Sequence, residues 1–239
     1  MTDPPLQPDQ PIVITIDGPA GTGKSTVAHQ LAGRLGLEFL DTGAMYRGAA
    51  LTALEHSIDP ADGPAVADAL QRHPLYFDWK VDPPTLIQDG RDISSRIREL
   101  DVSSIVSIVA AQPSVRDVLV EQQRRIAQEH PRLVTEGRDQ GSVVFPDAPI
   151  RFYLDADVKV RAGRRVAQMQ AAGKTEVDAD HIYRDLLERD RIDSTRRDGP
   201  LTRPREAIMI ETDHRSAEQV VDAMEQAVRE RLAQPERPS

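Results

Sequence analysis

The segment GPAGTGKST, residues 18–26, decides the fold class. It matches the pattern G-x-x-x-x-G-K-[ST], in which glycines let successive backbone N–H groups turn inward around an anion. An apolar, β-branched run (PIVITID, residues 11–17) precedes it, and a helical pattern that closes at Gly36 follows it. A helix that begins near Gly23 adds its positive dipole end at the same point. The segment therefore predicts a phosphate-binding loop (P-loop) for a nucleoside triphosphate.

Two side chains of the P-loop carry chemistry. Lys24 supplies a mobile cation for the β- and γ-phosphates. Ser25 offers a hydroxyl to Mg²⁺, which otherwise keeps mostly water and phosphate ligands. We therefore predict Mg²⁺, bound with ATP, as the cofactor and Ser25 as its protein ligand. The predicted ATP-binding residues are Gly18, Pro19, Ala20, Gly21, Thr22, Gly23, Lys24, Ser25 and Thr26.

Strand-like and helix-like patterns alternate on both sides of the P-loop. This order predicts right-handed crossovers, and hence an α/β fold of the P-loop class with a central parallel sheet between two helical layers. The predicted strands are 11–17, 37–41, 132–135, 150–154 and 207–211. The predicted helices are 24–35, 44–55, 101–111, 113–129, 158–172 and 216–232.

Two segments depart from this alternation. Prolines and glycines punctuate residues 57–100 around short strand-like pieces at 75–81 and 85–88, which predicts a small β-containing insert. Residues 161–203 are rich in arginine, and the charged stretch 173–205, broken by glycine and proline, is expected to include mobile structure. The core is then assigned to 11–56, 101–160 and 204–232, and the polar tails 1–10 and 233–239 are expected to be disordered.

The composition of the chain narrows the possible classes of protein further. A chain of 239 residues is long enough for one sizeable core. The formal net charge of −9 disfavours a nucleic-acid binder, and no apolar run approaches the ~20 residues that a membrane helix needs. The absence of cysteine excludes disulfides, thiolate metal sites and a cysteine nucleophile. The N-terminus lacks the pattern of a secretory signal, so a cytoplasmic location is expected.

Two further motifs follow predicted strands, at the sheet edge where open α/β sheets bind ligands. In DTGAMYR, residues 41–47, Tyr46 is placed to stack on a base and Arg47 to hold a phosphate; the alternative is an ordinary surface pair. In EGRD, residues 136–139, the carboxylate of Glu136 stands where a P-loop fold positions Mg²⁺ or water. The alternative there is a charged turn with a local ion pair.

These patterns leave the acceptor open. The missing N-K-x-D and L-S-G-G-Q motifs disfavour a GTPase and a transporter-type ATPase. A small-molecule kinase is favoured, with nucleotides such as UMP or AMP, or a metabolite such as shikimate, among the possible acceptors. A nucleotide-dependent switch without kinase activity is the remaining class.

The P-loop, the DTGAMYR run and the run EGRDQGSVVFPDA, in this order and spacing, resemble the bacterial cytidylate kinase family over residues 12–232. The resemblance implies a nucleoside monophosphate kinase core, an insert at 57–100 that binds the monophosphate, and an arginine-bearing lid at 161–203. It implies transfer of the ATP γ-phosphate to CMP or dCMP in pyrimidine nucleotide metabolism, by a monomer that needs neither nucleic acid nor membrane. Glu136 and Gln140 depart from the family pattern, where Asp and an apolar residue are common.

The resemblance also assigns residues to the acceptor. Thr42 falls near the cytosine, Tyr46 and Arg47 in the pocket, and Ser107 and Arg116 near the base. Arg138 and Asp139 fall at the phosphate and sugar. The full implied substrate-binding set is Thr42, Tyr46, Arg47, Ser107, Arg116, Arg138, Asp139, Arg189, Asp193 and Arg196.

The arginines of the lid segment have a structural interpretation and a functional one. Arg161, Arg164 and Arg165 are spaced to share a helix face, and surface ion pairs would explain most such residues. Phosphoryl transfer, however, spreads charge over three equatorial oxygens, which lid arginines neutralise while they exclude water. We expect Arg161 and Arg165 near ATP, and Arg189 and Arg196 near the acceptor phosphate. No general base is assigned, because a nucleotide phosphate is already anionic; the predicted catalytic residues are Lys24, Arg161, Arg165 and Arg189.

Overall fold

The computed structural model describes residues 10–171, 173 and 176–233. The tails predicted to be disordered, 1–10 and 233–239, lie outside the described residues except at Gln10 and Ala233. Ala233 is the last residue of helix α8 (Ala217–Ala233), so this helix ends one residue beyond its predicted end. No helix in the described part of the chain is long and apolar enough to cross a membrane.

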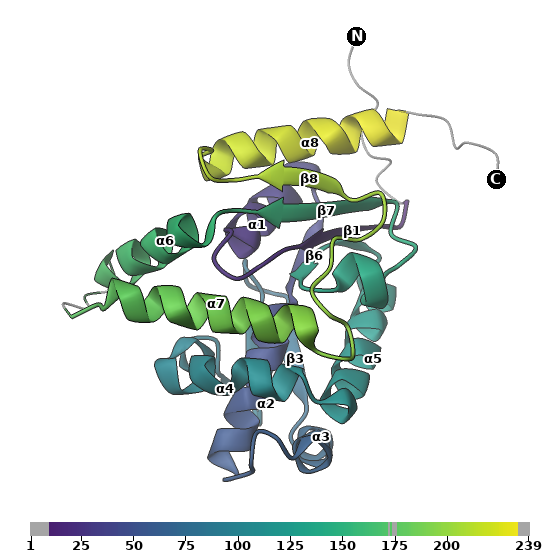
Figure 1. Ribbon diagram of the computed structural model, residues 1–239. Helices are drawn as coiled ribbons and strands as arrows, with labels where there is room; N and C mark the ends of the chain where they lie inside the picture. The colour runs from purple at the N-terminus through teal and green to yellow at the C-terminus, as the bar shows by residue number, and fades with distance from the viewer. Residues whose placement is uncertain (1–9, 172, 174–175, 234–239) are drawn as a thin grey trace.

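A five-stranded parallel sheet forms the centre of the molecule, as predicted (Figure 1). Its order is β2-β6-β1-β7-β8, and the first strand, β1, is buried almost throughout because both faces carry helices. All the pairings are parallel, so the carboxyl ends of the strands meet at one edge. The strands are β1 (Ile12–Asp17), β2 (Glu38–Asp41), β6 (Arg132–Gly137), β7 (Ile150–Asp155) and β8 (Ile208–Glu211).

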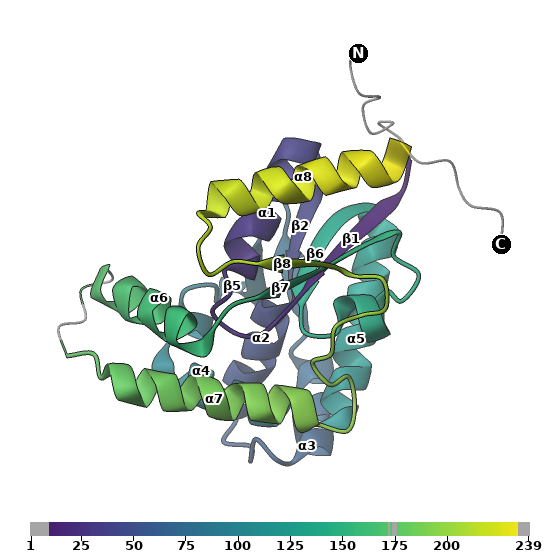
Figure 2. The same ribbon diagram turned by 45° about the horizontal axis from the view of Figure 1, so that its top comes forward.

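Helices cover the two faces of the sheet (Figure 2). Helix α1 (Lys24–Leu35) and α8 pack on one face, in a cluster with Ile14, Phe152 and Val221. Helix α1 ends at Gly36, whose φ of 63° gives the left-handed C-cap expected from the sequence. The other face carries α2 (Thr42–Glu55) and α5 (Pro113–Glu129), and α4 (Leu100–Ala110) packs against α2.

The insert contains a three-stranded antiparallel sheet, β3-β4-β5. Strand β3 (Leu75–Asp78) ends earlier than the predicted 75–81, whereas β4 (Thr85–Gln88) matches its prediction; β5 (Arg91–Asp92) and a 3₁₀ turn at Arg96–Arg98 follow. Helix α3 (Gly63–Arg72) was not predicted, because Pro64 was interpreted as a break. Pro64 instead begins the helix, where its missing N–H costs nothing, and Asp62 accepts from the Ala65 N–H at 3.1 Å.

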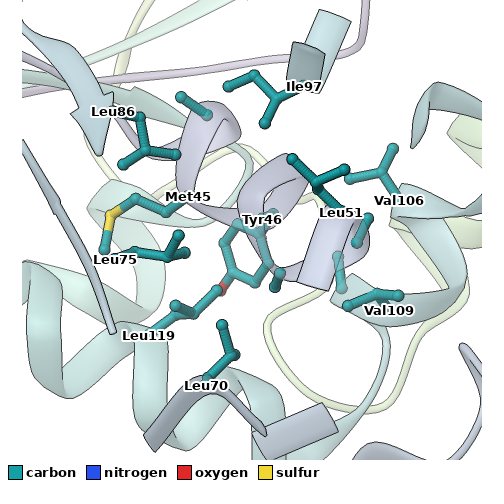
Figure 3. Close-up of a cluster of buried hydrophobic side chains, with 14 of the residues drawn as sticks. Met45, Tyr46, Leu51, Leu70, Leu75, Leu86, Ile97, Val106, Val109 and Leu119 are labelled. Atoms are coloured by element: carbon teal, nitrogen blue, oxygen red, sulfur yellow. The ribbon is translucent and has the colours of Figure 1, made fainter. Parts of the chain in front are cut away.

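The insert and the core share one hydrophobic cluster (Figure 3). Leu75 and Leu86 of the insert pack beside Met45 of α2 and Leu119 of α5. Gly48 permits this approach, since a Cβ atom there would lie 2.9 Å from methyl groups of Leu75 and Leu86. The insert is therefore packed onto α2 rather than around a core of its own.

The arginine-rich segment forms a helical hairpin beside the carboxyl edge of the sheet (Figures 1 and 2). It consists of α6 (Val158–Ala171) and α7 (Ala179–Thr195), which share a small apolar cluster with Ala20 of the P-loop. The sequence analysis predicted no helix at α7, because the glycines and prolines of residues 173–205 were given more weight than the helical pattern between them. Those residues in fact lie beyond the helix, and Asp178 caps it by accepting from the His181 N–H at 3.0 Å.

Candidate active site

The P-loop joins β1 to α1 at the carboxyl edge of the sheet. Gly18, Gly21 and Gly23 have φ values of 149°, 82° and 90°, which L side chains rarely adopt. At Gly18 a Cβ atom would also lie 2.1 Å from the Leu154 carbonyl oxygen of β7. Glycine is therefore required there both by the backbone conformation and by the neighbouring strand.

Lys24 is held over this loop. Its Nζ atom donates to the Pro19 carbonyl oxygen at 2.7 Å, and the residue is buried. Burial, together with the positive charges of Arg138 and Arg189, lowers the pKa of Lys24 to about 7 against the opposing effect of Glu136. Added negative charge would restore the protonated ammonium, so the surroundings of Lys24 are suited to a polyanion such as a triphosphate.

Three arginines from different elements face the same region. Arg47 of α2 contacts Asp41 through Nη2 and Oδ2 at 3.2 Å, and Arg138 at the end of β6 donates from Nε to Asp193 Oδ2 at 2.8 Å. Burial and the charge of Arg138 lower the pKa of Arg189, on α7, to about 10. The Nε atoms of Arg47 and Arg189 are buried without a hydrogen-bond partner among the described residues. These donors are consistent with an anionic ligand.

A second group of predicted residues meets at Asp139. Arg116 donates from Nη1 to the Tyr46 hydroxyl at 3.1 Å and from Nη2 to the Asp139 carboxylate. Arg196 Nη2 lies 3.7 Å from the other Asp139 oxygen, and its Nε donates to the Gly199 carbonyl at 2.6 Å. Residues from α2, α5, the end of β6 and the end of α7 thus form one buried polar cluster.

Thr42 and Ser107 occupy less defined positions. Thr42 is buried at the start of α2, where its hydroxyl donates to the Glu136 carbonyl at 2.7 Å. Ser107 is half-buried on α4, one turn before the short connection to α5 and Arg116. Thr42 therefore ties β6 to α2, while a base contact for either residue stays a prediction.

The two lid arginines expected on the ATP side have different surroundings. Arg161 is buried against the P-loop, donating from Nη1 to the Ala20 carbonyl at 3.0 Å and pairing through Nη2 with Asp190 at 2.7 Å. Arg165 donates from Nη1 to Gln168 Oε1 at 2.8 Å, and burial together with the charges of Arg47 and Arg98 lowers its pKa. Arg161 therefore lies beside the P-loop, while a role for either arginine at ATP stays a prediction.

The model of the family described as "Cytidylate kinase" matches residues 14–230. The chain belongs to the cytidylate kinase family. It is 43% identical over 220 residues to a cytidylate kinase from Mycolicibacterium paratuberculosis, covering 92% of this chain and 96% of that protein. It is 44% identical over 214 residues to a cytidylate kinase from Corynebacterium efficiens, covering 90% and 93%. Among solved structures, a gluconokinase from Sinorhizobium meliloti matches with a TM-score of 0.49 and 15% identity, covering 93% and 94%.

The structure of this cytidylate kinase fold draws attention to two buried carboxylates. Asp17, which sequence reasoning missed, ends β1 and accepts hydrogen bonds from two backbone amides. The signal available in the sequence was an acidic residue at the end of a predicted buried strand. Glu136 is also buried, and burial together with Asp41 raises its pKa to about 7, with Lys24 opposing.

The oxygen donors near Lys24 fit a hard cation bound with a phosphate ligand. The described residues contain no group of three or more His, Cys, Asp or Glu side chains that could hold a metal alone. Mg²⁺ needs no such group, because it keeps water and phosphate oxygens as most of its ligands. Ser25, in the first turn of α1, and the ionised form of Glu136 are the donors of the appropriate type.

Proposed function

We propose that this chain is an ATP-dependent cytidylate kinase, which transfers the γ-phosphate of ATP to CMP or dCMP and releases ADP with CDP or dCDP. The observation that carries the proposal is the convergence of Arg47, Arg138 and Arg189 on the region of Lys24. A cationic centre between a P-loop and an acceptor cluster is what phosphoryl transfer needs. Membership of the family and the names of its relatives support CMP as the acceptor.

In the proposed mechanism, residues 18–26 hold the triphosphate of ATP by backbone N–H groups, and Lys24 contacts its β- and γ-phosphates. Arg47, Arg138 and Arg189 hold the acceptor phosphate and neutralise the charge that spreads over the equatorial oxygens. Because that phosphate is already an anionic nucleophile, no base is needed, and catalysis consists of orientation and electrostatic stabilisation. Ser25 and Glu136 would hold Mg²⁺, which would supply charge neutralisation and alignment when bound with the nucleotide.

Recognition of the nucleoside is assigned to the cluster around Asp139. Thr42, Ser107 and Arg116 are proposed to face the base, and Asp139, Asp193 and Arg196 the sugar and the lid side. Arg161 would act on the donor side, because it braces the P-loop against α7. Arg165 is proposed to reach the transferred phosphate when nucleotides draw the lid inward.

The test is an acceptor panel of CMP, dCMP, UMP, AMP and shikimate, with ADP release and the phosphorylated product both measured. We expect the highest kcat/KM for CMP or dCMP. A preference for AMP would overturn the cytidylate assignment, and ATP hydrolysis without a phosphorylated acceptor would indicate a nucleotide switch. We also propose a cytoplasmic monomer; light scattering on the eluting protein tests the oligomeric state.

A further inference from the structure

Asp17 connects the donor loop to the acceptor loop. It is the last residue of β1 and directly precedes Gly18, and its side chain is wholly buried. Its Oδ1 atom accepts from the Gln140 N–H at 2.7 Å, and its Oδ2 atom accepts from the Gly141 N–H at 2.8 Å. These amides begin the short π-helix Gln140–Val144, where backbone N–H groups have no partner within the helix.

The clamped segment carries acceptor-side groups immediately before it. Arg138 binds Asp193 of the lid helix α7, and Asp139 binds Arg116 and lies beside Arg196. A displacement of the Gln140 and Gly141 amides would therefore move both side chains and the arginines that they hold. The pairing of β1 with β6 ends at Gly137, and beyond that point the Asp17 carboxylate ties the following segment to the end of β1.

We infer that Asp17 is a positioning residue for the acceptor, which fixes the Arg138–Asp139 segment relative to the P-loop through two backbone amides. The inference rests on the proposed function and extends it to a group that touches neither nucleotide. It explains how the donor and acceptor loops, which are far apart in the sequence, keep the spacing that in-line transfer requires.

A carboxylate is the side chain that this geometry demands. Both oxygens accept from N–H donors, whereas an amide at position 17 would direct its own N–H group against one of them. Burial raises the pKa of Asp17 to about 7, opposed by the two amides and by Lys24 of α1; Asp139 raises it further. Tyr153 of β7 also faces this carboxylate. An apolar residue at position 17 would leave both buried amides without an acceptor, so the segment needs an acceptor side chain here.

The same segment has an independent anchor, so the fold should survive loss of the clamp. The side chain of Gln140 donates to Gln123 Oε1 at 3.0 Å and accepts from the Thr135 hydroxyl at 2.9 Å. With this anchor intact, removing one Asp17 contact shifts the segment rather than unfolding it.

The test compares Asp17→Asn with Thr15→Val. Thr15 lies on the same strand, is equally buried, and its hydroxyl has no hydrogen-bond partner among the described residues. Asp17→Asn loses a charge-assisted hydrogen bond to the clamped segment, so it should raise KM for CMP about tenfold or more. KM for ATP should stay within about twofold to threefold, and Thr15→Val should match the wild type. An unchanged KM for CMP, or an equal rise in both KM values, would overturn the inference.

A second measurement does not depend on the acceptor or on the variant folding. In the free wild-type protein, the Gln140 and Gly141 amide resonances should titrate together with a midpoint near pH 7. In Asp17→Asn this titration should disappear. Wild-type amides that do not titrate would refute the clamp even if CMP is the substrate. A wild-type protein inactive towards CMP, with amides that do titrate, would instead refute only the proposed function.

Discussion

Arg138 donates from Nε to Asp193 Oδ2 at 2.8 Å, and this bond joins the end of β6 to the lid helix α7. Burial acts to raise the pKa of Asp193, but the guanidinium groups of Arg138, Arg189 and Arg196 hold that pKa below its ordinary value. Asp193 therefore stays ionised at neutral pH and keeps the lid arginines over the acceptor side. Lid position and acceptor binding are consequently expected to depend on this carboxylate.

Asp193→Asn should raise KM for CMP by about tenfold, because a charge-assisted bond to a buried arginine is lost. KM for ATP should change less, since the P-loop makes no contact with Asp193. Steady-state kinetics with each substrate varied in turn provides the measurement. Asp185→Asn is the matched control: Asp185 lies on the same helix but is exposed and pairs with His181, so its kinetics should stay within about twofold.

Arg47→Ala should mainly raise KM for the acceptor, again by about tenfold or more, because its guanidinium is proposed to hold the acceptor phosphate. The buried Nε atom, unpartnered among the described residues, marks the side chain as available for a ligand. Arg72→Ala serves as the control, since Arg72 is exposed and pairs with the exposed Asp68. Acceptor kinetics identical to the wild type in Arg47→Ala would show that the pocket is assigned wrongly.

Lys24→Ala should reduce kcat by roughly 10²–10³-fold or more, the usual effect of removing one group that stabilises transition-state charge. The effect should fall on kcat rather than on KM for CMP, because Lys24 is on the donor side. Rapid-quench measurement of product formation separates this step from product release. A variant that keeps wild-type turnover would exclude Lys24 from catalysis.

The sequence predicted the features that depend on neighbouring residues, and it did not predict those that depend on contacts between distant residues. The P-loop was predictable because its glycines encode local backbone geometry that the structure reproduces at Gly18 and Gly23. The parallel sheet followed from the alternation of patterns. The partners of Arg138 and Asp17 were not predictable, because Asp193 and Gln140 lie 55 and 123 residues away from them in sequence. Such pairings are set by tertiary packing, which no local pattern records.

Errors in the element predictions had a local cause. Pro64 was weighed as a breaker, although a proline in the first turn favours a helix and Asp62 was available as its cap. The spacing of Arg161 and Arg165 correctly predicted a helix, but not that Arg161 would brace the P-loop while Arg165 pairs with Gln168. Residue type and spacing therefore identified the arginines of this segment but did not predict which role each one has.

The shared cluster predicts that the insert and the core unfold together. Leu86→Ala should lower the free energy of unfolding by about 2–5 kcal/mol, the usual range for truncating a buried leucine. Trp79, the single tryptophan of the chain, lies in the insert and stacks on His130 of the core with ring centroids 4.0 Å apart, so its fluorescence reports on the contact between the two parts. Its denaturant transition should coincide with the far-UV circular dichroism transition in both proteins. Separate transitions would show that residues 57–100 form an independently folding unit.

The buried carboxyl group of Glu136 predicts a pH-dependent change in stability. Its pKa rises from 4.5 to about 7 on folding, so between these values the folded chain binds more protons than the unfolded chain. The stability that this group contributes is fully present below pH 4.5 and is lost as the pH rises through about 7. Glu136→Gln removes the buried charge but keeps the shape of the protonated group. In the ligand-free protein, the variant should melt close to the wild type at pH 5 but above it at pH 8.

The size of this effect follows from the length of the chain, since each kcal/mol recovered corresponds to about 2–4 °C in Tm for a domain of this size. Thermal melts of both proteins at pH 5 and pH 8 provide the measurement, with the exposed Glu129→Gln as the control. If Glu136→Gln melts below the wild type at pH 8, Glu136 carries a stabilising ionised contact in the free protein. Its carboxylate would then be anchored by the neighbouring arginines instead of being held for a cation that arrives with ATP.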